Sequence, residues 1–363
     1  MSDQPRPTDA EVIALLEALV RIPSYSGQEA EAAAYAVAAM RDLAYDQAVV
    51  DAAGNATGYL GDGERDVVLL GHIDTVAGVV PVRREGGRLY GRGAVDAKGP
   101  LATMLAAAAR ARPLRHLRVH VIGAVEEEAA TSKGARHVVG RHRPVAAVIG
   151  EPSGWDRITV AYKGRLLVDY SLERPVGHSA GRETGAAEEA VAYWNALCAY
   201  ARAYNQDRER AYDTLDPSLR ALNTASDGLM ERATMRIGLR LPLDLDPDAL
   251  AQRLREWAGD AQVRTHGAER AYRAEKRTPL ASAFLGAIRD EGSRGTYVSK
   301  TGTSDMNVVG PIWGCPLVAY GPGDSALDHT PHEHIVLDEY LAAIRVLTRA
   351  LRTLDDLAGA GRL

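Results

Sequence analysis

The chain has 363 residues, of which 46% are hydrophobic and 25% are charged, with 35 Gly and 17 Pro. This composition is that of a globular protein of about two domains, and it excludes disulfide-stapled mini-proteins, collagen-like chains and disordered chains. The formal net charge of −5 gives no overall cationic field for nucleic acid, and no apolar run reaches the ~20 residues of a membrane span.

The first 30 residues predict two helix starts and no secretory signal. The N-terminal segment lacks a basic start followed by an apolar stretch, so we expect a cytoplasmic protein. Thr8 with Glu11 and Ser26 with Glu29 have the spacing of a capping box, in which a hydroxyl and a glutamate satisfy free backbone donors. Each box predicts that a helix follows.

Short apolar runs then alternate with helical stretches. Such continuous runs are typical of strands covered on both faces, so the alternation predicts a mostly parallel α/β sheet covered by helices. Pro100 suits the first turn of a covering helix that ends near residue 111. Residues 337–357 return to helical spacing. The runs that predict strands are 67–70, 119–124, 145–149 and 317–320.

Within residues 164–271 the pattern becomes antiparallel. Apolar residues alternate with polar ones over 233–241, which is the period of a strand with one wet face. Helices are expected over 183–204 and from Pro247, with Asp246 as N-cap. We therefore predict a smaller α+β domain, residues 164–271, inserted into an α/β domain made of residues 1–163 and 272–363.

Acidic and imidazole side chains follow four of the predicted strands. The ends where strands give way to loops form the ligand crevice of an open α/β sheet, so these side chains should converge. Clustered carboxylates repel one another unless cations compensate them. Imidazole with carboxylate suits zinc or a related divalent ion, and the number of acidic ligands favours two ions that share a carboxylate. The residues that follow these strands are His72, Asp74, Glu126, Glu127, Glu151, Asp324 and His329, and Asp96 joins them from the glycine-rich turn 91–99.

Several motifs carry a resemblance to a known family. The sequence resembles the co-catalytic zinc metallopeptidases that include aminoacylase, carboxypeptidase G, acetylornithine deacetylase and succinyl-diaminopimelate desuccinylase. The resemblance implies a catalytic domain that holds two divalent ions, zinc or cobalt, and an inserted dimerisation or lid domain. The motifs are GHIDTV (71–76), GRGAVDAKG (91–99), EEE (126–128), GEP (150–152), GHSA (177–180) and GPGDSALDHTPHEH (321–334).

The resemblance also implies the metal ligands. His72, Asp96 and Glu151 would bind one ion, and Asp96, Glu127 and His329 the other, with Asp96 as the bridge. His332 and His334 compete with His329 for the last position. His329 is preferred because the family pattern places this ligand four residues before a glutamate, here Glu333.

Further roles follow from the same resemblance. Glu126 would be the general base that takes a proton from water and passes it to the leaving amine. Asp74 would hold the imidazole of His72 in its ligating tautomer. His178 would stabilise the oxyanion from the partner subunit of a homodimer, and Arg240 would pair with a substrate carboxylate.

Within the family, the similarity is greatest to hydrolases that release lysine or ornithine from the γ-carboxyl of the C-terminal glutamate of an acidic amino-group carrier protein. Lys300 and Ser304 belong to a polar loop that could contact the released amino acid. A free-standing deacylase of acetylornithine, acetyl-lysine or succinyl-diaminopimelate is the alternative enzyme. An inactive metal- or peptide-binding relative is the alternative of another class.

Overall fold

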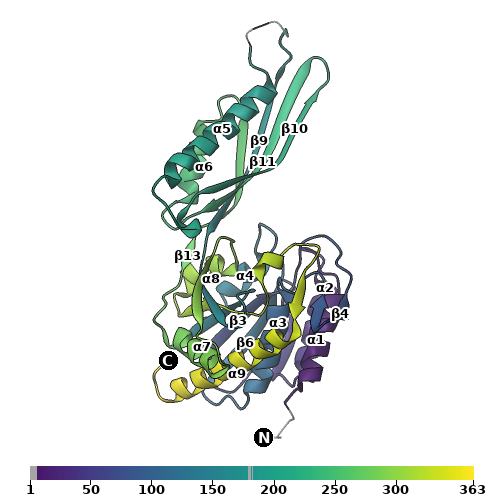
Figure 1. The fold of residues 1–363 in the computed structure, drawn as a ribbon, viewed down its shortest axis with the longest axis vertical. Coiled ribbons are helices and arrows are strands. Elements are labelled where there is room, and N and C mark those ends of the chain that lie inside the picture. Colours follow the sequence, from purple (N-terminus) through teal and green to yellow (C-terminus); the bar gives the residue numbers. More distant parts are fainter. Residues whose placement is uncertain (1–5, 179–180, 182) are drawn as a thin grey trace. The chain divides into compact units, whose positions relative to one another are not determined.

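The computed structural model describes residues 6–178, 181 and 183–363, and the chain forms two compact units. The first unit comprises the chain up to Val160 together with Ala274–Val298 and Ser304–Leu363 (Figure 1). The second unit comprises Ala161–Arg273 and Ser299–Thr303.

A nine-stranded sheet is the centre of the first unit. Its strand order is β1-β2-β6-β3-β7-β15-β8-β13, and β14 pairs with β8. The neighbours β6, β3, β7 and β15 are parallel, as the four apolar runs predict. The strands are β1 (Gln47–Val50), β2 (Ala56–Leu60), β3 (Arg65–His72), β6 (Leu117–Ala124), β7 (Ala146–Gly150), β8 (Arg157–Tyr162), β13 (Tyr272–Arg273), β14 (Thr296–Lys300) and β15 (Leu317–Ala319).

Helices cover both faces of this sheet. Consecutive residues at the end of β6 face different helices: Gly123 lies against Leu101 of α3, and Ala124 lies against Gly134 of α4. None of the helices in the described part of the chain is long and apolar enough to cross a membrane. The helices are α1 (Asp9–Arg21), α2 (Ala30–Asp42), α3 (Lys98–Ala111), α4 (Lys133–Val139), α7 (Pro279–Asp290), α8 (Asp305–Trp313) and α9 (Leu337–Gly359).

A small antiparallel sheet also belongs to the first unit. Its strand order is β16-β5-β4. The strands are β4 (Arg83–Glu85), β5 (Arg88–Tyr90) and β16 (His334–Val336), and β16 leads directly into α9. This sheet therefore connects the segment before α9 to the turn that carries Asp96.

One of the two predicted capping boxes is confirmed. Thr8 accepts a hydrogen bond from the backbone of Glu11 and the Glu11 side chain accepts one from Thr8 in return, so α1 begins as expected. The second prediction is wrong, because α2 begins after Glu29 and that residue makes no side-chain cap. The Ser26 hydroxyl donates instead to Asp74, just after β3, and the Glu29 carboxylate accepts from the backbone of Gly27 and of Glu126, just after β6.

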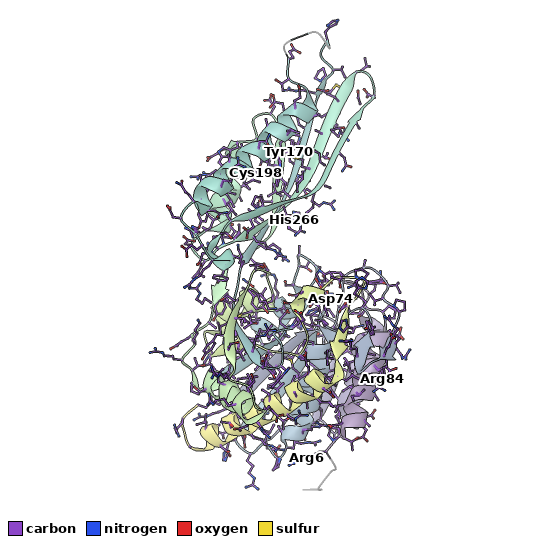
Figure 2. The ribbon with its side chains drawn as sticks, viewed as in Figure 1. Arg6, Asp74, Arg84, Tyr170, Cys198 and His266 are labelled. Carbon is purple, nitrogen blue, oxygen red and sulfur yellow. The ribbon has the colours of Figure 1, made fainter. Side chains whose placement is uncertain are left out.

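The second unit is an antiparallel sheet covered by helices. Its strand order is β10-β11-β9-β12, and the predicted alternation over 233–241 is confirmed as the buried face of β11. Tyr170 of β9, which is labelled in Figure 2, packs on Tyr193 of α5 with ring centroids 4.8 Å apart. The elements are β9 (Gly164–Pro175), α5 (Ala186–Asn205), β10 (Asp216–Ser226), β11 (Met230–Leu241), α6 (Pro247–Glu256) and β12 (Gln262–Glu269).

Candidate metal centre

Three parallel strands end at the same edge of the large sheet. His72 is the last residue of β3 and is level with Ala124, the last residue of β6. Glu151 follows Gly150, with which β7 ends. Asp96 approaches from the turn before α3, and His329 from the segment after β15. The structure therefore brings these predicted ligands to one edge of the sheet.

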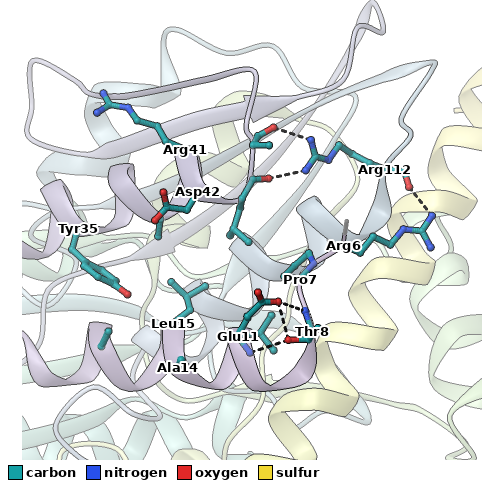
Figure 3. Close-up of a pocket in the computed structure, with 15 residues that line it drawn as sticks. Arg6, Pro7, Thr8, Glu11, Ala14, Leu15, Tyr35, Arg41, Asp42 and Arg112 are labelled. Atoms are coloured by element: carbon teal, nitrogen blue, oxygen red, sulfur yellow. Dashed lines mark hydrogen bonds between the residues drawn. The ribbon is translucent and has the colours of Figure 1, made fainter. Parts of the chain in front are cut away.

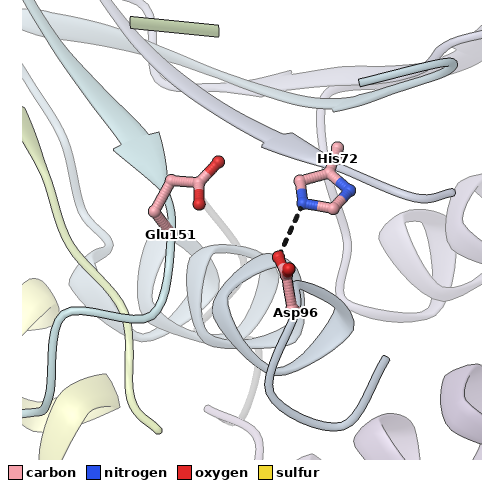
Figure 4. A group of neighbouring side chains, drawn as sticks. All are labelled: His72, Asp96 and Glu151. Atoms are coloured by element: carbon pink, nitrogen blue, oxygen red, sulfur yellow. Dashed lines mark hydrogen bonds and ion pairs between the residues drawn. The ribbon is translucent and has the colours of Figure 1, made fainter. Parts of the chain in front are cut away.

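His72, Asp96 and Glu151 form the first ligand set (Figure 4). Each offers one ligand atom, and these atoms all lie within 4.8 Å of one another. The Nε2 atom of His72 lies 3.2 Å from Oδ1 of Asp96. His72 and Glu151 are buried, so the set is shielded from bulk water.

Asp96 belongs to a second ligand set as well, with Glu128 and His329. The Nε2 atom of His329 lies 3.0 Å from Oδ2 of Asp96 and 2.8 Å from Oε1 of Glu128. The two oxygens of Asp96 thus face different histidines, which is the arrangement of a bridging carboxylate.

Glu128, and not Glu127 as the sequence analysis expects, is the glutamate of the second set. The chain turns sharply after β6, since Glu126 adopts a left-handed conformation with φ of +58°. Beyond that turn the strand alternation no longer decides which side chain faces the crevice. The motif offers three consecutive glutamates, so motif spacing alone leaves the position of the ligand uncertain by one residue.

Glu126 and Glu127 have different surroundings. The hydroxyl of Thr131 donates to the Glu126 carboxylate at 2.7 Å, and Lys133 lies 3.4 Å from it. Burial raises the pKa of Glu127 well above its ordinary value, and the nearby carboxylates of Glu151 and Asp305 add to the rise. Burial raises the pKa of Glu128 as well, but Glu128 contacts His329 and belongs to the second ligand set, whereas Glu127 belongs to neither set.

The charges of the cluster fit a cation. Burial, and then the charge of Asp96, raise the pKa of Glu151 well above its ordinary value. Hydrogen bonds to Asp96 and Glu128 raise the pKa of His329 to about 10. Both pKa values are raised because the cluster holds an excess of buried negative charge. A divalent cation in each set would compensate this charge. Imidazole and carboxylate donors without sulfur are ligands that suit zinc and related divalent ions.

Asp74 contacts both the glutamate segment and His72. Its carboxylate accepts hydrogen bonds from the backbone N–H groups of Glu127 and Glu128, each at 3.0 Å, and from the Ser26 hydroxyl at 2.7 Å. The Nδ1 atom of His72 lies 3.0 Å from the main-chain oxygen of Asp74 and 3.4 Å from its carboxylate. The main chain at Asp74 thus makes the shorter contact to the imidazole.

The competing histidines lie elsewhere. Nδ1 of His334 is bonded to the main-chain oxygen of His332, and its ring lies against Tyr90, with centroids 4.9 Å apart. Glu333 is fully buried and accepts hydrogen bonds from the backbone of Val95 and Asp96. It therefore connects the histidine segment to the turn that carries the bridging carboxylate.

The other predicted site residues are spread over both units. In the second unit, Nη1 of Arg240 donates to the Thr303 hydroxyl at 2.9 Å, and Lys300 ends β14. His178 is exposed after β9; residues 179 and 180 of its motif lie outside the described residues. In the first unit, Ser304 is buried and caps α8, accepting from Met306.

A cavity of about 780 Å³ between α1, α2 and the segment around Arg112 is separate from this centre (Figure 3). Its charged groups are bonded within the chain: Arg112 donates to the main-chain oxygens of Leu43 and Ala44, and Glu11 accepts from Thr8. None of the described predicted site residues lines it. The cavity is therefore separate from the two ligand sets.

Sequence reasoning missed two further residues that contact the glutamate segment. The sequence predicts Glu29 only as part of a capping box and carries no distinct signal for Asn55. Both are buried polar residues whose side chains bond to the backbone around Glu126. The Ser26–Glu29 spacing predicts a helix start, whereas in the structure the two side chains contact Asp74 and the backbone of Glu126.

Comparisons with known proteins find relatives that match most of the chain. The chain matches the model of peptidase family M20/M25/M40 over residues 68–353. It is 45% identical over 348 residues to the [LysW]-lysine hydrolase of Deinococcus radiodurans, which covers 94% of this chain and 96% of that protein. It is 39% identical over 353 residues to a putative [LysW]-lysine/[LysW]-ornithine hydrolase of Thermococcus kodakarensis, covering 96% and 93%.

A solved structure shows the same fold. The M20 family metallo-carboxypeptidase Sso-CP2 from Sulfolobus solfataricus superposes with a TM-score of 0.81 at 18% sequence identity. The match covers 96% of this chain and 100% of that chain. The likeness therefore includes the α/β unit that carries the ligand sets and the antiparallel unit.

Proposed function

Because the chain belongs to peptidase family M20/M25/M40, we propose that it is a metal-dependent amidohydrolase that releases lysine or ornithine from an amino-group carrier protein. The bond cut joins the α-amine of the amino acid to the γ-carboxyl of the carrier's C-terminal glutamate. The observation that carries the chemistry is the sharing of Asp96 between two ligand sets. The substrate is supported by the 45% identity to a [LysW]-lysine hydrolase.

His72, Asp96 and Glu151 would hold one divalent ion, and Asp96, Glu128 and His329 the other. We propose zinc, with cobalt as an alternative, because the donors are nitrogen and oxygen. Ions held there would supply the Lewis acidity that polarises an amide carbonyl and makes hydroxide available at neutral pH.

Glu127 is the general base of this proposal, in place of Glu126. It precedes a ligand without being one, which is the position that the family pattern gives to the base. It takes a proton from the attacking water and delivers it to the departing α-amine as the amide C–N bond breaks. Burial raises its pKa, which favours uptake of a proton from water. The carboxylate of Glu126 instead stays with Thr131 and Lys133.

We assign the binding of the substrate's carboxylates to residues of the second unit. Arg240 presents a guanidinium, whose planar fork suits a carboxylate, and its contact with Thr303 fixes one nitrogen. Lys300 would supply a second positive charge. Ser304, whose hydroxyl caps α8, is the third residue assigned to substrate contact.

A homodimer through the second unit completes the proposal. The edge strand β10 is mostly exposed, including Leu219 and Leu222, and within the described residues no strand pairs with its outer edge. Such an edge is a template for pairing with another chain. In a dimer formed there, His178 of one protomer would stabilise the oxyanion in the site of its partner.

One substrate panel tests the proposed function. A zinc-loaded preparation is assayed for amino acid release from carrier-linked lysine, carrier-linked ornithine, acetyl-lysine, acetylornithine and succinyl-diaminopimelate. We expect turnover of the carrier-linked substrates with far less release from the free acyl amino acids. Comparable activity on a free acyl amino acid would favour the deacylase, and no activity on any of them would favour an inactive relative.

A further inference from the structure

Four consecutive backbone N–H groups after β6 are each bonded to a side-chain oxygen. This is unusual for a loop, in which such groups commonly face water or a main-chain carbonyl. Val125 donates to Oδ1 of Asn55 at 3.0 Å, Glu126 to Oε1 of Glu29 at 3.1 Å, and Glu127 and Glu128 to the two oxygens of Asp74, each at 3.0 Å.

Asn55 also closes the base of the loop that these residues begin. Its Nδ2 atom donates to the main-chain oxygen of Gly134 at 3.3 Å and to Asp51 at 2.9 Å. Gly134 in turn donates to the main-chain oxygen of Val125 at 3.0 Å. One fully buried amide therefore holds both ends of loop 125–134, which carries the three glutamates.

The structure at the base of this loop leaves no room for a residue larger than glycine at position 134. A Cβ atom on Gly134 would lie 2.5 Å from Oδ1 of Asn55 and 2.5 Å from the backbone nitrogen of Val125. Glycine at this position thus allows the loop ends to approach the amide.

Glu29 holds the strained position of the loop. Its Oε1 atom accepts from Gly27 at 2.9 Å as well as from Glu126, whose φ of +58° is unfavourable for a residue with a side chain. Three adjacent glutamates could present different pairs to the ligand sets if the segment slipped by one residue. The side-chain oxygens of Asn55, Glu29 and Asp74 hold the backbone in the arrangement in which Glu127 and Glu128 face the ligand sets.

We infer that Asn55 and Glu29 are positioning residues of the hydrolase: with Asp74, they fix segment 125–128 so that Glu128 joins the second ligand set and Glu127 stands beside it as the base. The inference rests on the proposed roles of Glu127 and Glu128. It adds to them the part of the chain that selects these two glutamates from the triplet.

Asn55→Ala is the first test, and Asn205→Ala is its matched control. Asn205 brackets a loop of the second unit in the same way, with its amide bonded to the main-chain oxygen and nitrogen of Leu215 at 2.9 and 2.8 Å. Both variants lose an amide clamp, although Asn205 is less buried than Asn55, and only the Asn55 clamp holds the glutamates. Zinc is titrated into each metal-free protein, and kcat and KM are measured after loading.

We expect Asn55→Ala to weaken the binding of one of two zinc ions by about 10- to 100-fold and to lower kcat more than it changes KM. Asn205→Ala should bind both ions as the unmodified protein does. A folded Asn55→Ala protein with two zinc ions of unchanged affinity and unchanged kcat would overturn the inference. Zinc binding needs no substrate, so this result is independent of whether the carrier-linked substrate is correct.

Glu29 provides a second test if Asn55→Ala does not fold. Glu29→Gln keeps an oxygen that can accept from Gly27 and Glu126, whereas Glu29→Ala removes it. We expect Glu29→Gln to retain both zinc ions and most of kcat, and Glu29→Ala to lose affinity for one ion. Equal zinc binding and equal kcat in the two variants would contradict the positioning role.

Discussion

Glu126, Glu127 and Glu128 are chemically identical neighbours with three different surroundings. Glu126 is bonded to Thr131, Glu127 lies among buried carboxylates, and Glu128 contacts His329. The left-handed backbone at Glu126 separates these environments, at a conformational cost of about 1–3 kcal/mol that the surrounding hydrogen bonds must offset. Strain of this kind is common where a backbone must present a functional side chain.

The assignment of the base predicts different effects for two conservative substitutions. Glu127→Gln should lower kcat by about 10²- to 10⁴-fold because it removes the proton acceptor, while both metal ions remain bound. Glu126→Gln is the matched control and should keep most of the activity. Steady-state kinetics with metal analysis on both variants gives the answer. Loss of activity in Glu126→Gln alone would restore the assignment made from the sequence.

The ligand assignment predicts a change in metal content. Glu128→Ala should reduce the number of bound zinc ions per chain from two to one, because the second set would keep only Asp96 and His329. His332→Ala, in the same segment as His329, should still bind two. Elemental analysis of dialysed protein measures both. A Glu128→Ala protein that binds two ions with normal affinity would refute the assignment.

The sequence predicted the chemistry of the site better than its exact residues. His72, Glu151 and His329 meet where the strand-end argument places them, and Asp96 joins them from the glycine-rich turn. The position of the second glutamate depended on a left-handed turn, which has no distinct signature in a run of identical residues. Supporting side chains such as Asn55 act on the backbone of distant residues, and such contacts cannot be deduced from local spacing.

At the scale of elements, the buried strands were predictable because continuous apolar runs have few alternatives. The β11 strand and the start of α6 were equally clear from alternation and from Asp246 before Pro247. The start of α2 was not, because Ser26 and Glu29 bond to the site instead of to the helix. A capping motif is a local signal, and here contacts with distant residues overrode it.

A cluster after α5 predicts a pH-dependent contribution to stability. The hydrogen bond from Arg208, with a further one from the Tyr204 hydroxyl, holds the pKa of Asp244 below its ordinary value. A lowered carboxyl pKa stabilises the fold above the ordinary value of about 3.9, and the contribution is lost as pH falls through the folded-state pKa. Because the pair is largely exposed, it is worth no more than about 1 kcal/mol.

Asp244→Asn tests this contribution. The variant should unfold at lower denaturant concentration than the unmodified protein at pH 7, and the difference should shrink as the pH is lowered below 4. Chemical denaturation at several pH values measures it. A difference that grows in acid would show that the sign of the pKa shift is wrong.

At the scale of the whole molecule, the proposed dimer depends on the exposed strand β10. Leu222→Lys places a charge on this edge and should convert a dimer to monomers, since lysine on an edge strand opposes pairing. Leu243→Lys, at another exposed leucine of the second unit, is the control. Light scattering after size-exclusion chromatography gives the mass. A dimer that persists in Leu222→Lys would place the interface elsewhere.

The two-unit organisation also predicts complementation between protomers. If His178 acts in the site of its partner, neither His178→Ala nor Glu127→Gln should be active alone. A mixed dimer retains one site with both residues, so mixing and re-equilibrating the two inactive proteins should restore part of the activity. No recovery in mixed dimers, verified by tagged subunits, would show that His178 does not act across the interface.

The central claim, that one aspartate is shared by two metal ions, is tested most directly by anomalous diffraction from a crystal loaded with zinc. The account predicts two anomalous peaks about 3.5–4 Å apart on either side of Asp96, one bound by His72 and Glu151 and the other by Glu128 and His329. A single peak, or a second ion bound by Glu127 in place of Glu128, would contradict it.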